Sequence, residues 1–225
     1  GSGRCLLLVH GHPFNRTMWQ PQLDCFSQTG WRVVAPDLRG YGESTAVAGA
    51  TPLENCARAC LGVLDTLGIE RFVVAGLSMG GQIVMEIYRL FTDRIDGLIL
   101  ADTFPGAETP EGKVERQEMA ARLEADGIVD YSINTLPKMI AAYNVTRMPA
   151  VARKVLSMMI NTSPVGAAAA LRGRAERMDY VELLEGADVP SLVLVGRDDD
   201  FTPVSDAEFM HTILKQSTLR IFEGC

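Results

Sequence analysis

The chain has 225 residues, of which 47% are hydrophobic and 22% charged, and its net charge at pH 7 is −7. This length fits one domain, with or without an inserted subdomain, and the composition excludes a disordered chain. The apolar runs fall far short of the roughly 20 residues that cross a bilayer, so no membrane-spanning segment is predicted. An excess of 28 acidic over 21 basic side chains argues against nucleic acid or an anionic membrane surface as the main partner.

Short apolar runs, each followed by turn residues, recur along the chain and predict parallel strands that are buried on both faces. Segments with helical spacing lie between them. The clearest covers residues 53–67, after a capping-box start signal at Thr51, Pro52 and Glu54, and it stops at Gly68. This alternation predicts an α/β fold, a mostly parallel sheet with helices on both faces. The predicted strands cover residues 5–9, 31–35, 72–75, 98–101, 191–195 and 219–222.

One stretch breaks the alternation, because no strand is expected between Asp102 and Val189. Its spacing instead predicts helices at 111–125, 129–142, 150–160 and 165–176. We expect a helical cap at residues 103–186, inserted into a core made of residues 1–102 and 187–225. Six of the ten methionines fall in the cap. Flexible methionine side chains suit a lid over an apolar pocket, although a plain helical core fits this composition equally well.

The cysteines predict free thiols in a reducing compartment, and hence a cytoplasmic location. Their number is odd, and no C-x-x-C or Cys/His ligand spacing occurs. One pair lies a helical turn apart, which leaves a metal or redox site open, but two small buried apolar residues fit better. We expect no signal peptide. The five residues are Cys5, Cys25, Cys56, Cys60 and Cys225.

The strongest chemical signal is Gly76-Leu77-Ser78-Met79-Gly80, a G-x-S-x-G motif directly after a predicted strand and before a predicted helix. A serine in this context lies on a sharp, strained turn, where side chains at Gly76 and Gly80 would collide with their neighbours. The turn lifts the Ser78 hydroxyl above the sheet edge and aims the Met79 N–H at a developing oxyanion. The motif therefore predicts a serine nucleophile.

Two other loops follow predicted strands and should reach the same edge of the sheet. The first is His10-Gly11-His12-Pro13, where the His12 N–H is the expected second oxyanion donor, because proline has no N–H. We interpret the rings of His10 and His12 as structural rather than as general bases. The second loop, residues 196–203, carries three consecutive aspartates, one of which could orient a histidine.

Together with the segment 36–44 (Pro-Asp-Leu-Arg-Gly-Tyr-Gly-Glu-Ser), these motifs resemble the α/β-hydrolase fold family, in particular its cap-bearing esterases, lactonases and cofactor-free perhydrolases. The resemblance implies Ser78 as nucleophile and Asp199, in the Gly-x-x-Asp-x-x-Thr-Pro pattern, as triad acid. Asp102 is an alternative acid position in some relatives. Phe14 and the cap would shape an apolar substrate pocket. No metal or organic cofactor is implied.

The family's third triad member is a histidine in a Gly-His pair after the last strand, and the 225 residues lack it. Besides His10 and His12 the chain has His211, which we interpret as a surface or packing residue in a predicted helix. We therefore expect the sequence to be a window on a longer protein, with the histidine just past Cys225.

The leading hypothesis is a hydrolase that cleaves a small-molecule carboxylic ester or lactone through an acyl-enzyme. The same fold also supports perhydrolysis, carbon–carbon bond hydrolysis and a lyase step. The serine argues against haloalkane dehalogenases and epoxide hydrolases, which have an aspartate at this position. A non-catalytic ligand-binding module is the third hypothesis, and a residue other than histidine at the expected position would favour it.

Overall fold

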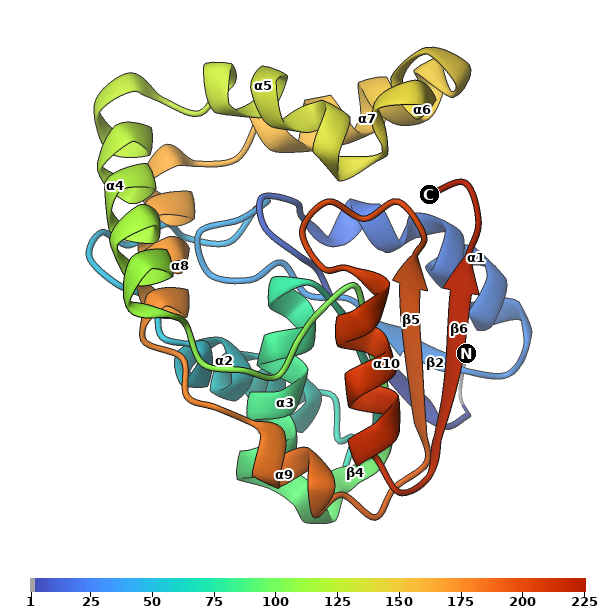
Figure 1. Cartoon of the computed structure of the whole chain (residues 1–225). Helices are drawn as coiled ribbons and strands as arrows, with labels where there is room; N and C mark the ends of the chain where they lie inside the picture. The colour runs from blue at the N-terminus through green and yellow to red at the C-terminus, as the bar shows by residue number, and fades with distance from the viewer. Residues whose placement is uncertain (1–2) are drawn as a thin grey trace.

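The structure, a computed structural model, describes residues 3–225 (Figure 1), and within them one sheet of six parallel strands has the order β2-β1-β3-β4-β5-β6. Each strand overlaps one of the predicted apolar runs, which confirms the α/β fold class. The strands are β1 (Cys5–Val9), β2 (Arg32–Val34), β3 (Phe72–Leu77), β4 (Ile95–Ala101), β5 (Ser191–Gly196) and β6 (Ser217–Phe222).

Helices connect successive strands, as parallel pairing requires. In the described part of the chain they are η1 (Arg16–Trp19), α1 (Gln20–Gln28), α2 (Leu53–Thr66), α3 (Met79–Phe91), η2 (Thr92–Arg94), α4 (Pro110–Asp126), α5 (Val129–Met139), α6 (Ala142–Arg147), α7 (Pro149–Ile160), α8 (Pro164–Ala175), α9 (Val181–Glu185) and α10 (Val204–Ile213). No helix within residues 3–225 has the length and apolar character needed to cross a membrane.

The two faces of the sheet bury alternate residues of each strand, as the period of two demands. Leu7 and Val9 of β1 join the largest hydrophobic cluster, which they share with side chains of α2, α3 and α10. Leu6 and Leu8 point to the opposite face, where they pack with Trp19 and the side chains of α1. Both faces of β1 are therefore buried, which explains its wholly apolar sequence.

Figure 1 shows α5, α6 and α7 above the arrowheads of β5 and β6, with α4 and α8 side by side at one edge. Helices α4 and α8 pack through small side chains, Ala120 against Ala167 and Ala168, which lets their backbones approach closely. We propose that residues 103–186 form the cap, whose last helix, α9, is anchored in the main core through Leu184.

The predicted helix at 129–142 corresponds to α5, which ends at Met139, three residues before the predicted end. Pro137 lies in the last turn of α5, where it has no N–H to continue the hydrogen-bond ladder. Ala141 then has a φ of 58°, a left-handed conformation that reverses the chain before α6 begins. The short helix α6 was not among the predicted helices.

The predicted capping box of α2 is also absent from the structure. The helix begins at Leu53 without a side-chain cap. Thr51 is buried instead, and its N–H donates to the carbonyl of Ala169 in α8 at 2.8 Å. A Cβ on Gly173 would overlap the Thr51 carbonyl. The segment before α2 is therefore held by α8 rather than by its own side chains.

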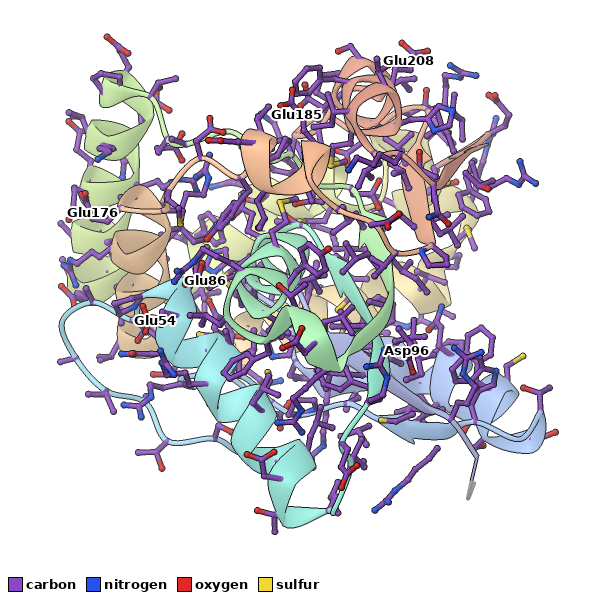
Figure 2. The ribbon with its side chains drawn as sticks, turned by 90° about the horizontal axis from the view of Figure 1, so that it is seen from below. Glu54, Glu86, Asp96, Glu176, Glu185 and Glu208 are labelled. Atoms are coloured by element: carbon purple, nitrogen blue, oxygen red, sulfur yellow. The ribbon has the colours of Figure 1, made fainter. Side chains whose placement is uncertain are left out.

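Figure 2 shows Glu54 of α2 and Glu86 of α3 on neighbouring helices. Glu86 is buried, and its carboxylate accepts two hydrogen bonds from Arg89 and one of 2.9 Å from the hydroxyl of Tyr180. Because a buried carboxylate requires such partners, these contacts hold α3 against the segment that leads into α9.

Candidate active site

Ser78 occupies a strained turn between β3 and α3. Its φ is 55° and its ψ −115°, which is unusual for a residue other than glycine. The turn is fixed from both sides, because the Ser78 N–H donates to the carbonyl of Ala101 at 2.8 Å and the Ser78 carbonyl accepts from Thr103 Oγ1 at 2.9 Å. The end of β4 thus clamps the backbone of the serine, while its hydroxyl group forms no hydrogen bond with the described residues.

The glycines around Ser78 allow three backbone segments to meet. A Cβ on Gly76 would overlap the carbonyl of Gly80, and a Cβ on Gly80 would overlap the carbonyl of Val9 at the end of β1. A Cβ on Gly11 would lie 3.6 Å from that of Ser78. The loop after β1 therefore packs directly against the serine turn.

We expect Gly80→Ala to lower the free energy of unfolding by at least ~2 kcal/mol, because the added methyl group forces a rigid backbone contact apart. Gly62→Ala is the matched control. A Cβ at Gly62 in α2 meets nothing within 4 Å, so the change should stabilise the protein by about 0.5–1 kcal/mol. Urea unfolding of both variants measures the difference, and equal effects would contradict the close contact at Gly80.

Ser78 lines a cavity of about 490 Å³ between the carboxyl ends of the strands and the helices above them. Among the other predicted site residues, His12, Phe14 and Asp199 also line it, as does the alternative acid Asp102. Met79 does not: its side chain is buried in the core. Its N–H, however, is the first of α3 and has no intrahelical acceptor.

The apolar part of this cavity lies on the cap side. Phe14 packs with Leu136, Met158 and Met159 in a separate hydrophobic cluster. Two cap methionines, Met139 and Met148, line the cavity directly. The methionine-rich cap thus contributes both to a helical core and to the cavity wall. The cavity lining with apolar side chains comprises Phe14, Leu77, Phe104, Met139, Ile140, Ala141, Met148, Val151, Leu171, Phe201 and Phe222.

Asp199 is fixed by its own loop. Its Oδ1 accepts from the N–H groups of Phe201 and Thr202 at 2.7 and 3.0 Å, and its Oδ2 accepts from the Thr202 hydroxyl at 2.8 Å. A carboxylate has about four lone-pair positions. Three are used here within the loop, and the carboxyl group of Asp102 also lies within hydrogen-bond reach of Asp199.

Asp102 lies beside Asp199 at the end of β4, and its Oδ1 accepts from the Gly196 N–H at 2.9 Å. Burial raises the pKa of Asp102 to about 6, against the opposing effect of that hydrogen bond, and the charge of Asp199 raises it further. The two carboxylates are therefore unequal, because Asp199 accepts three hydrogen bonds and Asp102 only one.

The free energy of unfolding should fall as the pH rises from about 4 to about 6, because of Asp102. The unfolded chain loses this proton near pH 3.8 and the folded chain near 6, so the folded state binds more protons in that window. Above pH 6 this loss in the free energy of unfolding reaches up to about 3 kcal/mol. Asp102→Asn should therefore be more stable than the parent at pH 7 and not at pH 4. Urea titrations at both values test this, and an equal difference at the two would contradict it.

The three histidines of the described chain do not form a triad with Ser78. His10 is buried, its Nδ1 2.9 Å from the carbonyl of Gly11 and its Nε2 accepting from the Leu38 N–H at 3.0 Å. His211 lies in α10 with its Nδ1 2.7 Å from the Ser217 hydroxyl, and it does not line the cavity.

Cys225 reaches the cavity beside Asp199. Its carbonyl accepts from the Asp198 N–H at 2.9 Å, and the preceding Gly224 carbonyl accepts from Asn144 of α6 at 2.8 Å. The hydroxyl of Tyr143 in turn donates to Asp198 at 2.5 Å. The segment 223–225 is therefore tied both to the loop after β5 and to the cap, next to the two candidate acids.

Three cationic side chains in the cavity wall were not predicted from the sequence: Arg116 of α4, Lys138 of α5 and Arg174 of α8. Nothing in their local sequence separates them from solvent-exposed helix residues, because their position depends on how the cap helices pack. Within residues 3–225 no three His, Cys, Asp or Glu side chains are grouped to hold a metal ion. Cys56 and Cys60 are buried thiols, and burial raises the pKa of both.

Comparison with known proteins agrees with this architecture. A family model described as alpha/beta hydrolase fold matches residues 5–225. The 3-oxoadipate enol-lactonase 1 of Acinetobacter baylyi is 28% identical over 92% of this chain and 76% of its own length. A non-heme haloperoxidase of Rhodococcus erythropolis is 27% identical over 100% of this chain and 85% of its own.

Solved structures give the same result. A thermophilic esterase from Thermogutta terrifontis, solved with malate bound, is 36% identical with a TM-score of 0.96 over 100% of this chain and 82% of its own. The enol-lactonase of Burkholderia xenovorans is 26% identical with a TM-score of 0.90 over 99% of this chain and 84% of its own.

Proposed function

Because the chain belongs to the alpha/beta hydrolase fold family, we propose that it is a serine hydrolase that cleaves a carboxylic ester or lactone through an acyl-enzyme. The observation that carries this proposal is the position of Ser78, on a strained turn at the start of α3 and facing the cavity that Asp199 also lines. A turn of this kind exposes a serine hydroxyl next to a helix N-terminus, where a developing negative charge is stabilised.

In the proposed mechanism a histidine that follows Cys225 takes the proton of the Ser78 hydroxyl, and the serine oxygen attacks the substrate carbonyl. The backbone N–H groups of His12 and Met79 hold the oxyanion, each lowering the barrier by roughly 3–4 kcal/mol. The protonated histidine then gives its proton to the leaving alkoxide. In the second half of the reaction the histidine takes a proton from water, which attacks the acyl-enzyme carbonyl. Ser78 regains its proton and the acid is released.

Asp199 is the proposed acid of this triad, because it lines the cavity beside Cys225, after which the histidine is expected. Three hydrogen bonds from its own loop fix the carboxylate in position to orient an imidazolium. The carboxyl group of Asp102, whose pKa is raised by burial, is less suited to this role.

The relatives support ester or lactone substrates, since they include an esterase and two enol-lactonases. The haloperoxidase relative favours one second activity, perhydrolysis, in which hydrogen peroxide replaces water in the attack on the acyl-enzyme. Both activities use the same serine and the same oxyanion donors. They differ only in the nucleophile that releases the acyl group.

A panel of p-nitrophenyl esters and lactones, assayed with the full natural protein, tests the proposal. We expect hydrolysis of at least one of them, and a lower rate of perhydrolysis when acetate and peroxide are supplied. If the folded protein turned over no ester and no lactone, the proposed function would be wrong. If peracid formation were faster than ester hydrolysis, perhydrolysis would replace ester hydrolysis as the proposed activity.

A further inference from the structure

The charged side chains in the cavity wall are separated by sign. Asp102, Asp198 and Asp199 follow β4 and β5, whereas the cations Arg116, Lys138 and Arg174 come from cap helices. An elongated substrate whose carbonyl lies at Ser78 would therefore meet acidic groups on one side and basic groups on the other. The three aspartates already have hydrogen-bond partners in the described chain. The cations are therefore the groups to examine for binding a charged part of the substrate.

Arg174 is a buried guanidinium without a carboxylate partner. Its residue is 8% exposed, and its Nε donates to Gln82 Oε1 at 3.1 Å. Its Nη1 and Nη2 atoms form no hydrogen bond or ion pair with the described residues. An unpaired charge is costly to bury, so this arrangement indicates a site for an anion.

The neighbouring charges do not neutralise Arg174. Glu108 pairs with Arg116 and Arg177 and not with Arg174, so two of the three neighbouring guanidinium groups share one carboxylate. Burial, together with the charges of Arg116 and Arg177, lowers the pKa of Arg174 to about 9. Arg174 is therefore still charged at neutral pH.

A second buried polar residue, His12, lines the same cavity. The His12 residue is 6% exposed, its Nδ1 lies 2.7 Å from the Tyr41 hydroxyl, and its Nε2 has no partner. The buried hydroxyl of Tyr41 has no other acceptor in the described chain, so it donates to Nδ1 and leaves the proton of the ring on Nε2. Burial and the nearby Arg174 hold the pKa of His12 well below its usual value, which keeps the ring neutral.

We propose that the Nη groups of Arg174 bind a carboxylate that the substrate carries in addition to the ester or lactone group. This inference rests on the proposed function and narrows its substrate class to monoesters of dicarboxylic acids or lactones with a free carboxylate. A guanidinium binds a carboxylate through two parallel N–H groups, and Nη1 and Nη2 of Arg174 are both available.

A matched pair of substrates tests this site. Mono-p-nitrophenyl glutarate has a free carboxylate, and its methyl ester has the same shape without the charge. We expect the natural full-length protein to favour the anionic member in kcat/KM by at least about 10-fold, and Arg174→Met to abolish this preference, which lowers the ratio by about 10-fold or more. The ratio cancels any general loss of activity. Arg174→Lys, which keeps the charge but not the two parallel donors, should recover part of it.

The control is Arg172→Met, the same change two residues earlier on α8. Arg172 pairs with Glu124 on the surface and does not line the cavity, so the ratio should stay within about 3-fold of the parent. Calorimetric titration with glutarate gives a readout that needs no turnover, and binding should be lost in Arg174→Met and kept in Arg172→Met.

The outcomes separate the two proposals. Hydrolysis of both esters without preference for the anionic one overturns the carboxylate site and leaves the hydrolase intact. Absence of turnover with glutarate binding that depends on Arg174 supports the site and counts against the hydrolase. If neither the preference nor glutarate binding is found in the natural protein, the site is wrong whether or not the variants fold.

Discussion

Replacing Ser78 by alanine is expected to lower kcat/KM for every ester or lactone substrate by at least about 10³-fold, because the bond-forming oxygen is removed. The oxyanion donors and the cavity remain, so a small residual rate above that in water should persist. The fold should be unaffected, because the Ser78 hydroxyl forms no hydrogen bond with the described residues. Steady-state kinetics and a thermal melt measure the two effects.

Ser191→Ala is the matched control for this change. It also removes one hydroxyl group from a serine of the sheet, where the Ser191 hydroxyl donates to the Val189 carbonyl at 3.0 Å, but it does so at the beginning of β5, away from the cavity. Its kcat/KM should match that of the parent. If Ser78→Ala retained more than about a tenth of the parent activity, another nucleophile would have to be sought.

The second large effect is expected for Asp199→Asn, with a loss in kcat of about 10⁴-fold. The amide cannot stabilise an imidazolium, and its NH₂ group would present a donor where the carboxylate presents an acceptor. The loop would also change, since Asp199 accepts three hydrogen bonds from Phe201 and Thr202. Kinetics and circular dichroism of the full-length variant separate the loss of catalysis from a loss of folding.

Asp102→Asn is the matched comparison, because both carboxylates lie at the same end of the cavity. If Asp199 is the triad acid, Asp102→Asn should lose less than about 10-fold in kcat. The reverse order, with the larger loss at Asp102, would assign the acid to the end of β4 and contradict the proposed triad.

The strands and the serine turn could be predicted because their signals are local. Each strand is a short apolar run, and the motif around Ser78 combines a strand, two required glycines and a helix start within a few residues. The resulting contacts of Gly76 and Gly80 follow from the absence of a Cβ at these positions. Local patterns of this kind are largely independent of how distant segments pack.

The cationic side chains on the cap side of the cavity could not be predicted, because their position depends on long-range packing. Arg174 lies within the sequence Arg-Gly-Arg-Ala-Glu-Arg (172–177), in which Arg172 is partly exposed and paired while Arg174 is buried. The difference arises because Gly166 and Gly173 let α8 approach the backbone at Gly40 and Thr51 closely. The sequence pattern of α8 does not reveal which arginine is buried, since small residues surround both.

The role of His12 was predicted only in part. The sequence indicated a backbone donor and a structural ring, and the ring does bond with Tyr41. Its other nitrogen, however, is buried without a partner in the described chain. Only the positions of Tyr41 and Arg174, which come from distant parts of the sequence, distinguish these two sides of the ring.

The central claim is that Ser78 is an activated nucleophile, and the most direct measurement is the intact mass of the full natural protein before and after treatment with a fluorophosphonate probe. An activated serine should add one probe rapidly, and Ser78→Ala should add none. Peptide mapping should place the added mass on the segment that contains Ser78. Absence of labelling on the folded, full-length protein would contradict the serine hydrolase and favour a binding protein built on the same fold.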